Sequence, residues 1–377
     1  MKDIGRRIVL GLAGLVVLVG ASGLMAGCAS PISPSTSSAG SSAASPSSSA
    51  QPGALFLLSS QEAAALRGEE SRFGSVIQRC DRQASQSPHP IATLALDPHY
   101  TASGVDASSH QSDPLAPDAQ MAYRDGLCFL VTGEARYATH AQSIIDAWTK
   151  TLTSAPTLQG KDAINFDMPY MIGAATWVRG ANNWNPSAFA SFLQGVVLPN
   201  AELTDPNNHG MWAVLMEASA ATFTGNHALM GSAQNRWAQI LQGEVTSDGS
   251  MPREAARSDT NNYRGGPDEG IKGIDYTHFT LEPASMSAKL FADAGLSVWQ
   301  SSGGQLLQRA FATAAGWTLD PASFQYFRGE KSKLIGVENA SYFPLLLKYY
   351  TNADAARVVS DGRINADGFE LAALFAN

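Results

Sequence analysis

The spacing of apolar residues beyond position 54 is the feature that most constrains the fold. Apolar side chains recur there every three or four residues, the period of a helix with one buried face, and no run of strands is visible. The clearest stretch covers 134–152, with apolar positions at Tyr137, Ala141, Ile144, Ile145, Trp148 and Leu152. Further helices are expected over 117–130, 186–197, 209–223, 228–241, 280–294, 305–315 and 342–350. Ser59 and Glu62 have the spacing of a capping box ahead of a first helix.

A weak internal repeat indicates how these helices are joined. The turn Thr132-Gly133 recurs as Thr224-Gly225, and an Ala-Gln pair follows at the same offset in both places. A glycine after the last helical residue is typical of a helix end, so each turn is expected to join two helices into a hairpin. We predict an all-α fold, an α/α barrel or incomplete toroid in a single domain over 54–377. A regular solenoid of helix pairs would need a stricter period.

The N-terminal segment has the pattern of an export signal. Residues 1–27 combine a cationic start with an apolar run, and the run ends in Leu-Met-Ala-Gly before Cys28, which resembles a bacterial lipobox. Residues 28–53 are expected to be a tether, because 29–53 contain eleven Ser, four Pro and no charge. We therefore expect lipidation at Cys28 and an exported, membrane-anchored lipoprotein that faces the periplasm or the cell surface. An uncleaved signal anchor and ordinary secretion are the alternatives.

Two further cysteines remain after Cys28. Cys80 and Cys128 form an even pair in a chain destined for an oxidising compartment, so we predict a disulfide between them, with two buried free thiols as the alternative. Neither a CxxC nor an HExxH motif is present, and the histidines of 89–110 lack the spacing of zinc ligands. No metal and no cofactor are predicted.

The charge balance excludes a basic nucleic-acid-binding protein. The sequence has 25 Lys and Arg against 33 Asp and Glu, a net charge of −8, and removal of residues 1–27 would make it −10. Such a field repels polyanions at long range, so an anionic partner needs a locally cationic site.

Two stretches carry polar residues suited to chemistry. Asn207-Asn208-His209 opens a predicted helix, where backbone N–H groups favour anions; the alternative is that the asparagines only cap the helix and His209 lies on the surface. Downstream, Arg253 and Arg257 are four residues apart and would share one face of a helix. Arg253 could equally pair with Glu254 or face solvent. Tyr276 follows, a residue type that is more often a core aromatic than an acid.

Together these stretches resemble the alginate lyase family of helical-toroid polysaccharide lyases. In that family an Asn-Asn-His element precedes a helix, an Asp-Gly-x-x-Pro segment leads to an Arg, and a Tyr follows before an aromatic-x-Leu-x-Pro context. The matching residues are Asn207, Asn208, His209, Asp248, Gly249, Pro252, Arg257, Tyr276, Phe279, Leu281 and Pro283. The resemblance implies that Asn208, His209, Arg257 and Tyr276 are catalytic.

The resemblance also implies a reaction, β-elimination on a uronate polysaccharide rich in mannuronate. An amide donor and a cation, Asn208 and Arg257 with help from His209, would neutralise the sugar carboxylate and stabilise the adjacent carbanion without metal. Tyr276 and His209 would then act as base and acid, since neighbouring cations favour a phenolate. The expected partner is an anionic uronate polymer, and the protein is expected to be a monomer that binds no nucleic acid.

Six residues are predicted to contact the substrate: Tyr100, Asn207, Trp212, Arg253, Tyr263 and Arg264. The resemblance implies that the family's entrance-lid tyrosine falls near Tyr100. Two others lie in 258–272, a polar insertion that separates Arg257 from Tyr276 by 19 positions instead of about two helical turns.

Two other functions remain open from the sequence. A glycoside hydrolase on the same architecture would use two carboxylates, for which Asp167, Glu217 and Glu282 are candidates. A glycan-binding lipoprotein would use aromatic platforms such as Trp184 and Trp212, but it would not need the Asn, His, Arg and Tyr set.

Overall fold

The computed structural model describes residues 54–98, 113–201, 204–260 and 264–376. Helices dominate these residues, and the only bridges recorded among them are isolated ones. Within this part of the chain no helix is both long and apolar enough to cross a membrane. The predicted all-α class is confirmed.

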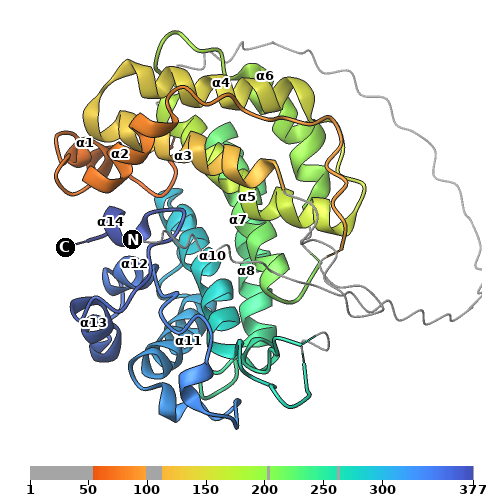
Figure 1. Ribbon diagram of the computed structural model, residues 1–377, viewed down its shortest axis with the longest axis vertical. Coiled ribbons are helices and arrows are strands. Elements are labelled where there is room, and N and C mark those ends of the chain that lie inside the picture. Colours follow the sequence, from red (N-terminus) through yellow and green to blue (C-terminus); the bar gives the residue numbers. More distant parts are fainter. Residues whose placement is uncertain (1–53, 99–112, 202–203, 261–263, 377) are drawn as a thin grey trace, which may run out of the picture.

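In the described part of the chain, four helices form the interior of the fold, three others lie against them from outside, and a short fourth packs against one of those three (Figure 1). The inner helices are α3 (Leu115–Thr132), α5 (Leu158–Val178), α7 (Asn208–Thr224) and α10 (Gly273–Asp293). The outer helices are α4 (Ala135–Thr151), α6 (Ser187–Phe192), α8 (His227–Glu244) and α11 (Ser302–Leu319). Nearly every residue of α5, α7 and α10 is buried, whereas α4 and α8 bury one face, which is the difference between a core helix and a covering helix.

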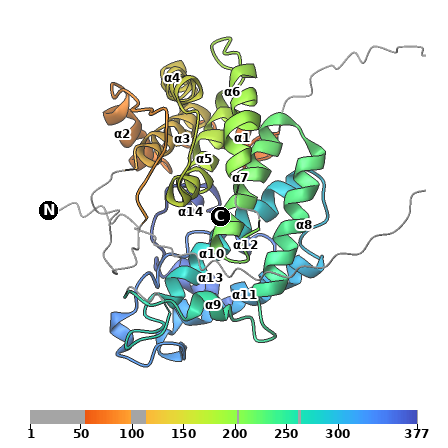
Figure 2. The same ribbon diagram turned by 90° about the vertical axis from the view of Figure 1, so that its right-hand side faces the viewer.

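Shorter helices complete the chain. They are α1 (Ser60–Leu66), α2 (Gly74–Gln83), α9 (Pro252–Ala255), α12 (Phe343–Leu347), α13 (Ala353–Ser360) and α14 (Leu371–Leu374). A π-helical turn, Leu193–Val197, continues α6, and 3-10 turns occur at Leu198–Asn200, Pro321–Ser323 and Lys331–Lys333. Figure 2 shows the α7 and α8 hairpin beside α9 to α11.

The predicted hairpin turns and caps are present. Gly133 and Gly225 end α3 and α7 with φ of 80° and 67°, the left-handed conformation that glycine adopts without steric cost. Ser59 and Glu62 form the capping box ahead of α1. Helix α5 was not predicted, and α10 begins at Gly273, seven residues before its predicted start at 280.

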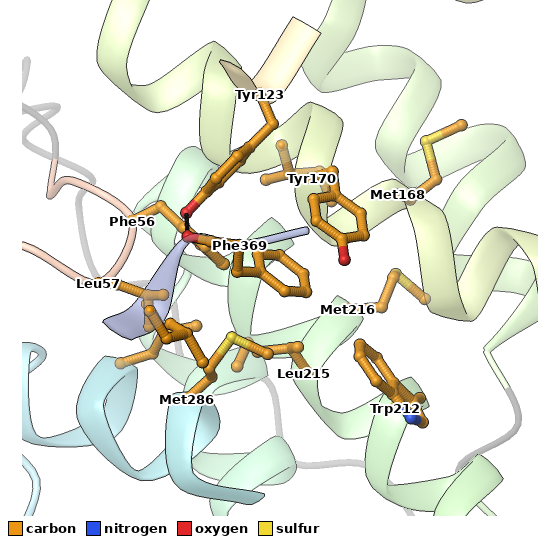
Figure 3. Packing of buried hydrophobic residues seen from close by; sticks show 14 of the residues in the cluster. Phe56, Leu57, Tyr123, Met168, Tyr170, Trp212, Leu215, Met216, Met286 and Phe369 are labelled. Carbon is orange, nitrogen blue, oxygen red and sulfur yellow. Dashed lines mark hydrogen bonds between the residues drawn. The ribbon is translucent and has the colours of Figure 1, made fainter. Parts of the chain in front are cut away.

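Aromatic contacts align the inner helices. Phe166 of α5 packs edge-on against Trp212 of α7 and Phe279 of α10, with ring centroids 5.7 and 5.5 Å apart. Tyr170 of α5 stacks on Phe369 at 3.7 Å, and Trp212 also faces Phe369 at 6.3 Å (Figure 3). Trp212 and Phe279, whose ring centroids are 5.0 Å apart, lie within the first two turns of α7 and α10, so these helices begin at the same end of the interior.

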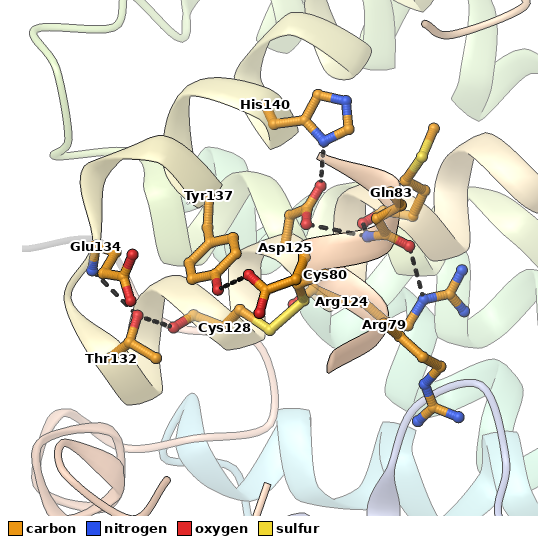
Figure 4. The surroundings of a disulfide bond; sticks show 12 residues. Arg79, Cys80, Gln83, Arg124, Asp125, Cys128, Thr132, Glu134, Tyr137 and His140 are labelled. Atoms are coloured by element: carbon orange, nitrogen blue, oxygen red, sulfur yellow. Dashed lines mark hydrogen bonds and ion pairs between the residues drawn. A yellow bond between two sulfur atoms is a disulfide. The ribbon is translucent and has the colours of Figure 1, made fainter. Parts of the chain in front are cut away.

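The predicted disulfide joins α2 to α3. The Cα atoms of Cys80 and Cys128 are 6.8 Å apart, and the two residues are 48 positions apart in the sequence. Beside it, Asp125 accepts hydrogen bonds from Gln83 and contacts the Nδ1 atom of His140 at 2.6 Å (Figure 4). The bond therefore fastens the N-terminal segment to an inner helix.

Replacing both Cys80 and Cys128 by Ser should lower the free energy of unfolding by about 4 kcal/mol, because the open chain regains the entropy of a loop of this length. Denaturant unfolding of the double variant against the oxidised parent measures the change. Equal midpoints and slopes for the two proteins would contradict the expectation.

A buried acid on α7 makes stability depend on pH. Glu217 is 4% exposed, and burial raises the pKa of its carboxyl from 4.5 to about 7. Between these values the folded chain holds a proton that the unfolded chain releases, so the free energy of unfolding should fall as pH rises from about 4.5 to about 7. Glu217→Gln should flatten this fall in urea unfolding across that range. An unchanged slope in the variant would show that Glu217 titrates normally.

Candidate active site

The four predicted catalytic residues come from three segments and are all buried. Asn208 and His209 open α7, Arg257 follows α9, and Tyr276 lies in the first turn of α10. Their exposed fractions are 0%, 1%, 2% and 2%, in that order. Burial of a histidine at this level excludes the alternative that His209 is a surface residue.

A carboxylate that the sequence analysis did not select connects two of these residues. Glu254 of α9 is 0% exposed and accepts hydrogen bonds from the backbone N–H of Asn208 at 3.2 Å and from its amide nitrogen at 3.1 and 3.2 Å. It also accepts from Arg257 Nε at 3.0 Å. One buried carboxylate thus holds both the amide and the guanidinium.

Arg257 in turn lies over the ring of Tyr276. Its Cζ atom is 4.7 Å from the ring centroid, within the range of a cation–π contact. A positive charge beside a phenol favours the phenolate over the neutral form. The arrangement therefore brings Arg257 and Tyr276 together, as the motifs predicted.

His209 has a carboxylate partner of its own. Its Nδ1 atom is 2.6 Å from Oδ1 of Asp162, a residue of α5 that is 1% exposed. Since a carboxylate accepts, this contact assigns the proton to Nδ1 and leaves Nε2 as the basic nitrogen of the neutral ring. Phe166 packs edge-on against the same imidazole at 5.4 Å.

Comparison with known proteins follows this geometry. Residues 73–324 match the family model described as alginate lyase. The chain belongs to the alginate lyase family. No curated protein matches it at a significant level.

Solved structures give the same answer for the fold. An alginate lyase from Bacteroides ovatus aligns with a TM-score of 0.68 and 14% identity, over 86% of this chain and 99% of that one. Alginate lyase A1-III from Sphingomonas species A1 aligns with a TM-score of 0.61 and 13% identity, over 84% and 96%. The fold is thus the α/α toroid of these alginate lyases.

Next to the family residues lies a second acid and arginine pair. Glu244, at the end of α8, is buried and contacts Arg253 at 3.1 Å, while the Arg253 side chain is 48% exposed. Burial and the charge of Glu254 raise the pKa of Glu244 to about 7. Arg253 pairs with Glu244, and Arg257 pairs with Glu254. The two alternatives considered for Arg253, a pair with Glu254 or exposure to solvent alone, are therefore both wrong.

The other predicted substrate contacts differ in their placement. Asn207 caps α7, because its side-chain oxygen accepts from the N–H of His209 at 2.9 Å. Trp212 is 4% exposed and packs among Phe166, Phe279 and Phe369, so its ring belongs to the aromatic core and does not present a platform. Arg264 is exposed and donates to the backbone oxygen of Arg253 at 3.4 Å.

Tyr100 and Tyr263, like Cys28, lie outside the described residues. Within the described part of the chain, no group of three or more His, Cys, Asp or Glu residues could hold a metal ion. A surface cavity of about 300 Å³ occurs at the far end of α7, lined by residues such as Arg179, Phe223 and Thr224. It contains none of the predicted residues.

Gly273 allows the close approach on which the Arg257 and Tyr276 contact depends. A Cβ atom there would lie 2.0 Å from the carbonyl oxygen of Ala255 in α9. Gly273→Ala should push α9 away from α10 and lower the free energy of unfolding by about 1–3 kcal/mol. Gly231→Ala in α8, where nothing lies within 4 Å, is the matched control and should not destabilise. Equal unfolding midpoints for the two variants would contradict this assignment.

Proposed function

We propose that this protein cleaves a uronate polysaccharide, mannuronate-rich alginate first, by β-elimination that does not require a metal. Membership of the alginate lyase family and the shared fold support a polysaccharide lyase. The observation that carries the finer proposal is the buried group in which Glu254 joins Asn208 to Arg257 and Arg257 covers Tyr276.

The first task of the site is to neutralise the substrate carboxylate. The two oxygens of Glu254 lie close together, whereas the two N–H bonds of an amide diverge. One N–H of Asn208 therefore points at both oxygens of Glu254, and the second is left to donate to the substrate carboxylate. Arg257 supplies the charge. The N-termini of α7 and α10 add partial positive charge at the same place.

The second task is proton transfer. The Tyr276 phenolate takes the proton from the carbon beside the carboxylate, and the electron pair forms the new double bond as the glycosidic C–O bond breaks. Tyr276 then returns a proton to the departing oxygen, so no water is consumed. His209, oriented by Asp162, assists as a base through Nε2 or, when protonated, as a further neutralising charge.

Relatives and surface residues support a polymeric substrate. Tyr-to-Phe and His-to-Ala variants of alginate lyase A1-III are known as complexes with a tetrasaccharide. In this chain the exposed Arg253 and Arg264 adjoin Arg257 and would meet further carboxylates of a uronate chain. Tyr100 and Tyr263 are proposed to complete those contacts. Export and a lipid anchor at Cys28 would place the enzyme where such polymers occur.

Hydrolysis by the buried acids is disfavoured. Burial and neighbouring carboxylates raise the pKa of Asp167 and Glu282 well above the ordinary range, and burial raises that of Glu217 to about 7. A glycosidase needs one carboxylate ionised to act as base or nucleophile. The raised pKa values favour the neutral form of all three acids, which disfavours them as that pair.

The decisive measurement incubates the full domain with polymannuronate in the presence of a chelator and follows the ultraviolet absorbance of the unsaturated product end. Tyr276→Phe should lower kcat about 10³-fold, since it removes the group that transfers the proton. Tyr326→Phe, which removes a hydroxyl bonded to Ser250, is the control and should keep its activity. Reducing ends without absorbance would indicate a hydrolase, and binding without cleavage a glycan-binding protein.

A further inference from the structure

Glu254 does more in this geometry than pair with an arginine. We propose that it is a positioning residue, one that sets the orientation of both Asn208 and Arg257 for the reaction. This inference rests on the proposed function, because the role of those two residues defines what is positioned. No motif of the family residues named above contains Glu254.

The hydrogen bonds of Glu254 determine which way the Asn208 amide faces. A carboxylate only accepts, so the nitrogen of the amide must point at Glu254 and the oxygen away from it. The oxygen of Asn208 is buried and has no hydrogen-bond partner among the described residues. Without Glu254 nothing described here would prevent the amide from turning over and presenting its oxygen, an acceptor, to an anionic substrate.

Glu254 also fixes Arg257 from the inner side. It accepts from Nε, the guanidinium nitrogen nearest the backbone, so the outer end of the group points away from Glu254 while Cζ lies over Tyr276. The pair is buried, and a guanidinium left without its carboxylate there would carry a large desolvation cost. The carboxylate therefore keeps Arg257 in the interior beside the phenol.

A third contact links this carboxylate to the fold. Glu254 accepts from the backbone N–H of Asn208, one of the N–H groups at the start of α7 that have no partner within the helix. The negative charge also suits the positive end of the helix. The side chain of Glu254 thus links α9 to the N-terminus of α7, one residue before His209.

The test is Glu254→Gln in the full domain. Glutamine has nearly the same shape, but it offers one acceptor oxygen in place of two and turns an N–H₂ group toward the donors. We expect kcat on polymannuronate to fall about 10²-fold with a smaller change in KM, and Glu254→Asp, which keeps both oxygens, to recover part of the loss. Glu217→Gln, a buried acid of α7 that does not touch the site, should keep full activity.

A double-mutant cycle separates positioning from simple loss of stability. In Asn208→Ala and Arg257→Lys backgrounds, Glu254→Gln should cost less than about 10-fold, because the groups it positions are already altered. Equal losses in every background, or full activity of Glu254→Gln, would overturn the inference.

A readout independent of catalysis distinguishes this inference from the proposed function. In ¹⁵N spectra the Nε–H signal of Arg257, assigned by its absence in Arg257→Lys, should exchange slowly with water and should exchange at least 10-fold faster in Glu254→Gln. If the parent protein cleaves no uronate polymer yet shows this change, the proposed function fails while the pairing stands. An unchanged exchange rate would overturn the pairing itself.

Discussion

The near-complete burial of α5, α7 and α10 is the constraint on which the rest of the structure depends. A helix buried on all sides can only sit among other helices, so each inner helix needs an outer one to cover it and return the chain. The aromatic contacts of Phe166 with Trp212 and Phe279 then fix α7 and α10 in register. The polar residues of the candidate site lie near the N-terminal ends of α5 and α7, where Asp162 meets His209 and Glu254 of α9 meets Asn208.

This arrangement reconciles an acidic chain with the anionic substrate proposed for it. Arg257 is paired with the buried carboxylate of Glu254, and His209 with that of Asp162. The site therefore has little net charge, and in the proposed function Arg257, the amide donor and the helix N-termini act on the substrate carboxylate from close by. Recognition of this kind acts at contact distance, so it is compatible with a net charge that repels polyanions from afar. The partly exposed arginines Arg253 and Arg264 add charge only at the periphery.

The sequence supported the prediction of the hairpins but not of the helix that holds Asp162. Gly133 and Gly225 reveal helix ends because left-handed conformations favour glycine. Helix α5 was not predicted because a helix that is buried on nearly all faces lacks the periodic spacing of apolar residues. Pro169 in its interior also indicates a helix break when only the sequence is read. Because α5 was not predicted, its residue Asp162 was not recognised as the partner of His209.

Glu254 was overlooked for a different reason. It was considered only as a partner of its neighbour Arg253, whereas in the structure it pairs with Arg257 and with Asn208, which is 46 positions away. Local spacing does not record contacts between segments so distant in sequence. The residues proposed to perform the chemistry were found by motif, whereas the residue proposed to orient them depends on the tertiary fold.

The insertion that departs from the family's spacing leaves Arg257 and Tyr276 in contact, for a reason visible in its ends. The backbone N–H of Lys272 donates to the carbonyl oxygen of Arg257 at 3.0 Å, so the chain returns to its starting point before α10 begins. Asp268 accepts hydrogen bonds from the backbone N–H groups of Asp259 and Thr260, so residues near the two ends of the insertion are bonded to each other. Arg257 and Tyr276 are therefore 19 positions apart in the sequence, yet the guanidinium of Arg257 lies over the ring of Tyr276. What the insertion can change is the surface beside Arg257, where the backbone of Arg264 forms an isolated bridge with that of Arg257. In the proposed function this surface would meet the part of the polymer that lies beyond the bond that is cleaved.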